Sequence, residues 1–370
     1  MARRVIASAA LAEAPRRLAW TGEQQQHPPI QRPPARVDAS VTGRHAEWAA
    51  ILLDAPRAQA AYVFVLWGSQ PACSQFDELF GAILALRDTA PVHDIVALLT
   101  EAWSSLSWPT TELRRHGVRV GTVRNTEHVA CQDEYRDNKA YLAGSWTIYS
   151  IWSLTAYDAV LYMDSDSQVM HNVDHVFELM LRGRSSVLQM GKQGVCGRWG
   201  GMNTGVWMVR PNASVFAQLR DMLRSGRPRF PCDIGFQGGV NAFFSDNSKR
   251  QFWTSKTNKC NLWMEPLNAT YNCNTISMAP CGPGGFAHIV HWSGNPKPNH
   301  PSLWDKASGA PRPFINYTDG NVTKYHIRAR MHPLQAEAIS SYMRNTRRAA
   351  RLHRGCIHTG SVSLAPERIV

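Results

Sequence analysis

The stretch Tyr157-Asp158-Ala159-Val160-Leu161-Tyr162-Met163-Asp164-Ser165-Asp166-Ser167 does most to decide the fold of this chain. Its apolar residues 159–163 predict a buried strand, which ends abruptly at two carboxylates, Asp164 and Asp166. In an open α/β sheet, ligands gather at the carboxyl ends of the strands, so a site is expected here. Carboxylate oxygens suit a divalent cation, and such a cation can hold a diphosphate. The alternative is a solvated acidic turn, because paired aspartates also arise by chance.

Strands and helices are predicted to alternate along the chain before the two acids. Apolar runs predict strands at 61–66, 95–99 and 118–123, and helical spacing predicts helices at 76–86, near 103–116 and at 139–155. The last helix is expected to place Ile148, Ile151, Trp152 and Thr155 on one face. This βαβαβ alternation is typical of a nucleotide-binding half-sheet. Beyond the acids we expect helices at 173–180, 213–223 and 236–244, strands at 186–190, 206–209 and 289–291, and irregular structure at 255–287.

Composition divides the chain into three predicted parts. Residues 1–58 are rich in Gln, Pro, Arg and Ala and are expected to form a disordered or targeting leader. Residues 59–323 hold the predicted strands and helices and are expected to form a single catalytic domain. Residues 324–370 are rich in Arg and predict a basic C-terminal helix or tail.

The net charge of +12 lies mostly at the two ends of the chain. Residues 324–370 hold nine Lys and Arg against two acids, and residues 1–50 hold seven Arg against four acids. The middle of the chain is therefore close to neutral, with a net charge of about +2 by the same count. This distribution argues against a nucleic-acid partner, which would need a basic surface on the folded domain.

The eight cysteines indicate an oxidising compartment. No two of them have the CxxC spacing of a zinc site. Disulfides in a lumen explain this cysteine content better than buried cytosolic thiols do, and the sequon at Asn268 lies between Cys260 and Cys273. We therefore expect the secretory pathway or Golgi lumen, with a cytoplasmic location as the alternative. The other sequons are at Asn212, Asn316 and Asn321.

A second candidate segment, His291-Trp292-Ser293-Gly294-Asn295-Pro296-Lys297-Pro298, completes the predicted metal site. His291 directly follows a predicted strand, and a neutral imidazole can join two carboxylates around Mn²⁺. Lys297 can fold back across the Gly and Pro loop and place its charge on a phosphate. Alone, such a histidine is more often structural than a ligand.

Two further segments carry polar side chains suited to a sugar. Asn203, in the small-residue run 200–205, offers both a donor and an acceptor to a hydroxyl group. Asp233 and Gln237 lie at the start of a predicted helix, where polar groups can face an anionic or hydroxylated ligand. The alternatives are an ordinary turn before a strand for Asn203 and a helix cap for Asp233.

Together these segments resemble the glycogenin-like glycosyltransferases of family eight. The resemblance spans roughly residues 61–300, and the motifs occur in the order of that family. The residues that carry it are Tyr62–Leu66, Trp152–Asp158, Met163–Asp166, Met202–Val206 and the His-x-x-Gly-x-x-Lys-Pro element at His291, Gly294, Lys297 and Pro298.

This resemblance implies a GT-A type α/β fold, a Rossmann-like central mixed sheet flanked by helices. It implies a metal-dependent retaining enzyme that moves a hexosyl unit from a UDP-sugar to a hydroxyl of a glycan, polyol or protein, and it is compatible with a homodimer. Mn²⁺, or Mg²⁺, would be held by Asp164, Asp166 and His291. The other implied roles are nucleotide binding by Tyr62, Leu66, Asp164, Ser165, Gly294 and Lys297, and contact with the donor sugar by Asn203, Asp233 and Gln237.

Two departures from the family pattern favour a second interpretation. The family usually has a Lys four residues before the Trp of the helix, and this chain has Ile148 there. The family's Gly-Asp-Gln-Gly element is also altered: either Asp233 matches its Asp or Gln237 matches its Gln, but not both. The alternative function is therefore a catalytically degenerate member that binds UDP or a glycan.

Overall fold

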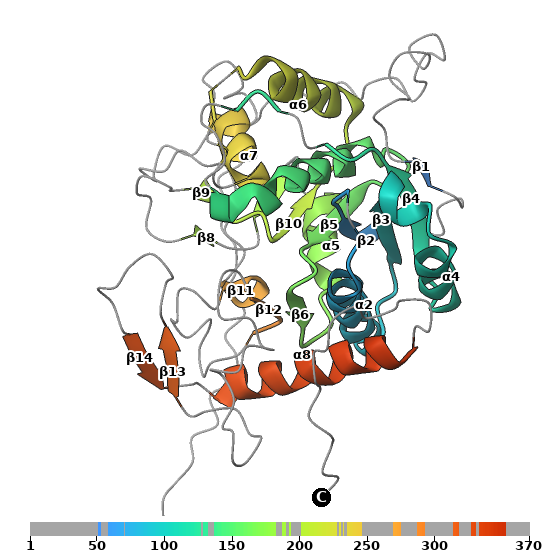
Figure 1. The fold of residues 1–370 in the computed structure, drawn as a ribbon, viewed down its shortest axis with the longest axis vertical. Helices are drawn as coiled ribbons and strands as arrows, with labels where there is room; N and C mark the ends of the chain where they lie inside the picture. Colours follow the sequence, from blue (N-terminus) through green and yellow to red (C-terminus); the bar gives the residue numbers. More distant parts are fainter. Residues whose placement is uncertain are drawn as a thin grey trace, which may run out of the picture. The chain divides into compact units, whose positions relative to one another are not determined.

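A mixed seven-stranded sheet lies at the centre of the chain (Figure 1). The computed structural model describes residues 51–52, 58–69, 71–126, 129–131, 137–182, 187–189, 192–193, 201–227, 229–230, 232, 235–245, 269–274, 287–292, 314–317, 327–330 and 333–352. In spatial order the strands are β1 (Ile51–Leu52), β4 (Arg119–Val123), β3 (Asp94–Thr100), β2 (Ala60–Leu66), β5 (Ala159–Met163), β10 (Val206–Val209) and β7 (Val187–Gln189). Strands β2 to β5 run parallel, whereas β1, β10 and β7 pair antiparallel with their neighbours.

Helices cover both faces of this sheet, which explains why its strands are mostly apolar. Successive residues of β2 point into two different cores: Tyr62 and Phe64 into one, Val63 and Val65 into the other. The first core is lined by α2 (Cys73–Asp88), α3 (Glu101–Ser104), α4 (Ser107–Arg115) and α5 (His175–Arg182). The second is lined by η2 (Asp137–Ser153), α6 (Ala213–Ser225) and α7 (Phe236–Ser245).

A second, small sheet continues from the end of β5. It joins β6 (Ser167–Val169) to β12 (Ile289–His291) antiparallel, and β12 to β11 (Cys273–Asn274) parallel. His291 pairs with Ser167 in this register, which brings two segments more than 100 residues apart into contact. The remaining short elements are β8 (Lys192–Gln193) with β9 (Gly201–Met202), β13 (Phe314–Tyr317) with β14 (Ile327–Arg330), and η4 (Ala269–Tyr271).

The C-terminal helix α8 (Pro333–Leu352) packs along α2 (Figure 1). Its buried side chains recur at helical spacing and form one stripe along the helix. A Cβ built on Gly81 of α2 would lie 3.1 Å from the Cα of Thr346, so glycine allows the two helices to approach closely here. The buried stripe consists of Ala338, Ser341, Tyr342, Asn345 and Ala349.

The predicted α/β fold is confirmed, including the Rossmann-like mixed sheet flanked by helices and the strand that carries the two acids. Strands predicted at 61–66, 95–99, 118–123, 186–190, 206–209 and 289–291 correspond to β2, β3, β4, β7, β10 and β12. No helix among the described residues has the length and apolar character needed to cross a bilayer. The boundaries of the three predicted parts of the chain stay a prediction.

The helix predicted near 103–116 is wrong in its continuity, because α3 and α4 are separate helices. Pro109 explains the break. Its ring would clash with the carbonyl of Ser105 in a continuous helix, and it has no N–H to donate. In α4 it occupies the first turn, where backbone N–H groups have no helical partner and proline is tolerated.

Two other predicted helices needed correction, and one strand was missed. The helix predicted at 139–155 has 3₁₀ geometry and ends at Ser153, so Thr155 is exposed and does not share a face with Ile148. The helix predicted at 173–180 begins two residues later, because the Asn172 side chain accepts a hydrogen bond from the Asp174 backbone N–H and forms a turn. Strand β6 was not predicted, since it is short and polar.

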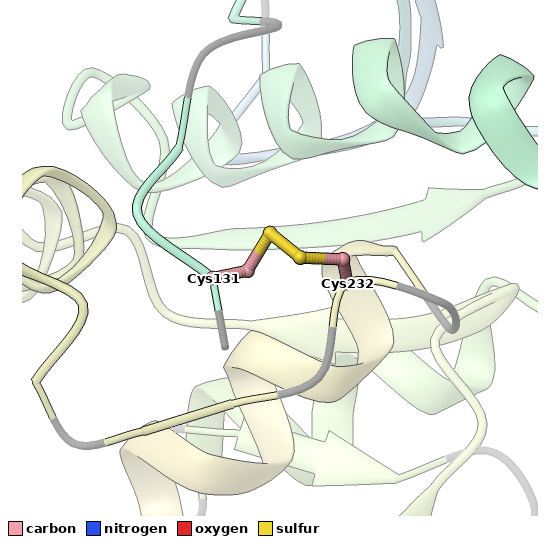
Figure 2. The surroundings of a disulfide bond; sticks show 2 residues. All are labelled: Cys131 and Cys232. Carbon is pink, nitrogen blue, oxygen red and sulfur yellow. A yellow bond between two sulfur atoms is a disulfide. The ribbon is translucent and has the colours of Figure 1, made fainter. Parts of the chain in front are cut away.

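A disulfide between Cys131 and Cys232 joins the segment after β4 to the segment between α6 and α7 (Figure 2). The chain before Cys131 runs along the end of α6, where the Ala130 N–H donates to the Leu223 carbonyl at 2.8 Å. Cys73 and Cys273 are disulfide-bonded as well. Every cysteine that the structure describes is therefore oxidised.

Candidate metal centre

Asp164, Asp166 and His291 converge at the carboxyl edge of β5. The Nε2 atom of His291 lies 3.5 Å from an oxygen of Asp164 and 3.4 Å from an oxygen of Asp166. One ligand atom from each of the three residues lies within 4.8 Å of the others. The His291 side chain is buried at 3% exposure, whereas Asp164 and Asp166 are 26% and 13% exposed, so an ion could reach the group from the acid side.

The backbone explains why these three side chains meet. The chain leaves β5 at Asp164 and turns into β6, and the Ser167 N–H donates to the Asp164 carbonyl at 3.0 Å across this turn. Strand β12 then pairs with β6 and ends at His291. The Trp292 N–H donates to the Asp166 carbonyl at 3.0 Å, which extends the pairing to the metal group itself.

A buried amide orients the imidazole of His291. Its Nδ1 lies 3.1 Å from the Oδ1 of Asn272, and the Nδ2 of Asn272 donates to the Oδ1 of Asn203 at 3.1 Å. The Asn203 Oδ1 also accepts from the Gly205 N–H at 3.0 Å, which identifies it as the acceptor. Asn272 must then present its oxygen to His291, so Nδ1 donates and Nε2 faces the carboxylates, as in many metal sites.

The two carboxylates control the protonation of His291. Burial lowers the pKa of this imidazole, but the charges of Asp166 and Asp164 and their hydrogen bonds outweigh burial and raise the pKa to about 9. Without a cation, a proton on His291 therefore neutralises part of the acidic charge. A divalent cation would take the place of that proton and bind the neutral imidazole.

Tyr162 holds the first aspartate in place. Its hydroxyl donates to the Oδ1 of Asp164 at 2.5 Å. Complete burial and the charge of Asp164 raise the pKa of Tyr162 well above its usual value, so the hydroxyl stays protonated and remains a donor. The other oxygen of Asp164 is the one that faces His291.

Gly205 allows the imidazole to lie against the backbone of the neighbouring strand. A Cβ at this position would collide with the ring of His291, so a side chain cannot be accommodated. The Gly205 carbonyl also accepts from the Asp164 N–H at 2.7 Å. The small residues before β10 therefore serve the metal group directly.

The structure brings two of the predicted sugar-contacting residues close to the metal group and places other predicted residues elsewhere. Asn203 is linked to His291 through Asn272, and the Gln237 side chain accepts from the Thr204 N–H at 3.3 Å. Ser165 lies half-buried between the two acids. Asp233, Gly294 and Lys297 lie outside the described residues.

The two residues of β2 that were predicted to bind the nucleotide differ in their position relative to the metal group. Leu66 ends β2 at the same edge of the sheet as Asp164, with its side chain in the core. Tyr62 pairs with Leu161, three residues before Asp164, and its hydroxyl donates to Asp174 at 2.7 Å. The structure therefore does not bring the Tyr62 side chain to the metal group.

Two residues of the metal centre were missed by sequence reasoning. Asn272 lies in a segment expected to be irregular, and neither spacing nor composition distinguishes it from its neighbours. Tyr162 is part of the apolar run of β5 and was counted as core. A tyrosine one residue before a strand end, next to an acid, was the available signal. Ile148, which replaces the family lysine, is buried in the core at 3% exposure and brings no charge to the site.

Known proteins resemble this chain over part of its length. No family model matches it. It is 24% identical to galactinol synthase 1 from Solanum lycopersicum over 192 residues, 46% of this chain and 57% of that protein. It is 30% identical to glycogenin-1 from Homo sapiens over 152 residues, 40% of this chain and 37% of that protein. A solved structure of the glycosyltransferase GlyE from Streptococcus pneumoniae aligns with a TM-score of 0.45 and 14% identity, over 81% of this chain and 65% of that chain.

The chain is similar to the glycogenin-like glycosyltransferases. The predicted resemblance is thus confirmed at low identity. The alignments span at most 57% of the length of the two curated relatives, so their whole-protein activities and substrates are not carried over here.

Proposed function

We propose that this chain is a metal-dependent retaining glycosyltransferase, which moves a hexosyl unit from a UDP-sugar to a hydroxyl group of a glycan, polyol or protein. The observation that carries the proposal is the Asp164, Asp166 and His291 group at the carboxyl end of β5, in a chain similar to glycogenin-like transferases. The donor set supports the choice of ion. Two carboxylates and one imidazole suit Mn²⁺, or Mg²⁺ with weaker preference for the imidazole.

The residues of the site have distinct proposed tasks. Asp164, Asp166 and His291 hold the ion, and Tyr162 and Asn272 keep two of these ligands oriented. A bound divalent ion supplies positive charge that stabilises the departing diphosphate. Lys297 is proposed to add a second positive charge there. Asn203, Asp233 and Gln237 are proposed to contact the donor sugar, and Ser165 and Gly294 the nucleotide.

The proposed transfer needs no protein nucleophile. The bond between the anomeric carbon and the phosphate oxygen breaks, and a bond to the acceptor oxygen forms on the same face of the sugar. The acceptor hydroxyl gives its proton to the departing phosphate, so charge and atoms balance. The sugar passes through an oxocarbenium-like state that the surrounding polar groups must stabilise.

A second candidate function is a degenerate family member that binds UDP or a glycan without turnover. The observation that favours it is Ile148, which is buried in the core where the family usually has a lysine. Loss of one positive charge near a diphosphate would slow the departure of UDP more than it would weaken nucleotide binding.

A donor screen tests both candidates. Purified chain would be incubated with Mn²⁺ and a panel of UDP-sugars, and released UDP would be measured together with UDP binding. The rate of UDP release should be at least about 1,000-fold lower for the Asp166→Ala variant. Asp158→Asn is the matched control, because Asp158 is an exposed carboxylate just before the opposite end of β5.

The outcomes separate the candidates. Turnover of one or more donors that disappears with Asp166→Ala, and persists with Asp158→Asn, supports the enzyme. UDP binding without turnover of any donor supports the degenerate member. Turnover that survives Asp166→Ala would remove the metal group from the mechanism.

We also propose that the chain works in an oxidising compartment, such as the Golgi lumen. The support is that all four cysteines of the described residues are disulfide-bonded. The test is thiol mapping by mass spectrometry on protein isolated from its native source. Reduced Cys131 and Cys232 in that material would favour the cytoplasmic alternative.

A further inference from the structure

Helix α8 contacts the small sheet next to two metal ligands. The buried side chain of Gln168, two residues after Asp166, donates to the Ser341 hydroxyl at 3.1 Å. The ring of Trp292, directly after His291, packs edge-on against the ring of Tyr342, with centroids 6.3 Å apart. One helix therefore contacts a residue of β6, two positions after Asp166, and the residue that directly follows His291.

Tyr342 belongs to the buried stripe of α8, and its ring contacts Trp292, the residue after His291. It is 3% exposed, and burial, followed by the charges of Glu78 and Asp166, raises the pKa of its hydroxyl well above the usual value. The phenol stays neutral, so it adds no charge to the acidic group.

The position of α8 is itself well defined. Helix α8 packs against α2. The two helices lie so close together beside Thr346 that a side chain at Gly81 would be crowded. Arg348 forms an exposed ion pair with Asp88 at the end of α2, at 3.0 Å. Helix α8 can therefore act as a rigid support, because it rests on α2, whose other contacts are with the core of the large sheet.

We propose that α8 is a working part of the metal centre, and that Tyr342 and Ser341 are positioning residues that keep Asp166 and His291 at their mutual distance. This inference rests on the proposed metal-dependent function. Strands β6 and β12 have only three residues each, so their own hydrogen bonds constrain them weakly. The contacts from α8 to Gln168 and Trp292 supply the missing constraint.

The test measures metal binding directly. The full chain and its variants would be titrated with Mn²⁺ alone, and free Mn²⁺ would be followed by electron paramagnetic resonance. Tyr342→Ala should weaken Mn²⁺ binding at least about 10-fold, and Ser341→Ala should weaken it several-fold. Tyr342→Phe keeps the ring packing and should bind within about twofold of the parent chain. Ser340→Ala is the matched control for Ser341→Ala, because Ser340 is exposed on the same helix, and it should leave the affinity unchanged.

Circular dichroism would establish that each variant is folded. Weakened Mn²⁺ binding in folded Tyr342→Ala, with recovery in Tyr342→Phe, supports the inference. Parent-like affinity in folded Tyr342→Ala and Ser341→Ala would overturn it, and if Tyr342→Ala does not fold, Ser341→Ala decides by the same measure. A parent chain that binds no Mn²⁺ would overturn the proposed metal function as well, which distinguishes the two failures.

Discussion

The large and small sheets of this chain are built in different ways. In the large sheet, β2, β3, β4 and β5 are buried strands of five to seven residues separated by helices, and they occur close together in the sequence. In the small sheet, β6, β11 and β12 have two or three residues each, and β6 pairs with a strand about 120 residues later. The large sheet is supported by two apolar cores, whereas polar residues occupy much of the small one.

This difference separates stability from function. Apolar burial is the main source of folding free energy, so the large sheet should determine whether the chain folds. The metal group lies where the two sheets meet: Asp164 directly follows β5 of the large sheet, Asp166 directly precedes β6 of the small sheet, and His291 ends β12. Small shifts of the small sheet should therefore change metal binding with little effect on the stability of the whole domain.

The largest expected effect is on the stability of the large sheet. Leu98 of β3 is fully buried, and Leu98→Ala should lower the free energy of unfolding by about 3 kcal/mol. Urea denaturation would measure the change, with Val92→Ala at an exposed position as the control. Mn²⁺ affinity of the folded variant should stay within about twofold of the parent. A large loss of affinity would contradict the separation of the two sheets.

The second substitution is at the metal group, and it should change metal binding rather than the stability of the fold. Gly205→Ala places a methyl group against the His291 ring and should weaken Mn²⁺ binding about 100-fold. Gly117→Ala is the control, because nothing lies near that position although its φ is positive. That control should lose about 1 kcal/mol of stability and keep its metal affinity. Parent-like Mn²⁺ binding by Gly205→Ala would mean that His291 can move without loss.

Asn272 tests whether orientation of a ligand matters by itself. Asn272→Leu removes the acceptor for the His291 Nδ1–H and should weaken Mn²⁺ binding at least about 10-fold. Asn272→Asp keeps an acceptor oxygen for Nδ1 but loses the donor to Asn203, so it should recover part of the affinity. Isothermal titration calorimetry would compare the two variants. Equal affinities for Leu and Asp would show that the amide has only a packing role.

A change of pH, which leaves every residue in place, should also change metal binding. The pKa of His291 is raised to about 9 in the protein without metal, so below that pH an ion must displace a proton. The affinity for Mn²⁺ should therefore rise with pH by up to about tenfold per unit and level off near pH 9. The same linkage predicts that the metal-free chain loses stability as pH rises from 6.5 to 9. Metal affinity that is flat between pH 6 and 8 would contradict the displacement of a proton from His291.

Local sequence was sufficient for the large sheet but not for the small one. Apolar runs and helical spacing act over short distances, and they predicted β2, β3, β4, β5 and β10 with bounds correct to within two residues. Pro109 divided a predicted helix in two, and Asn172 delayed the start of another. Strand β6 could not be predicted, because the polar residues Ser167 and Gln168 show no strand pattern in the sequence. They are extended because they pair with β12, which lies far along the chain.

The order of amino acids was enough to predict the α/β class, the strand that ends just before Asp164, and the residue types of a cation site in Asp164, Asp166 and His291. These features follow from periodicity and donor chemistry, which are properties of short segments. How the group is held became evident only in the folded chain, where Tyr162 bonds one aspartate, Asn272 lies behind the imidazole, Gly205 lies against it and α8 contacts the small sheet. The Tyr162 bond is local, but each of the other contacts joins segments that meet only when the chain packs together.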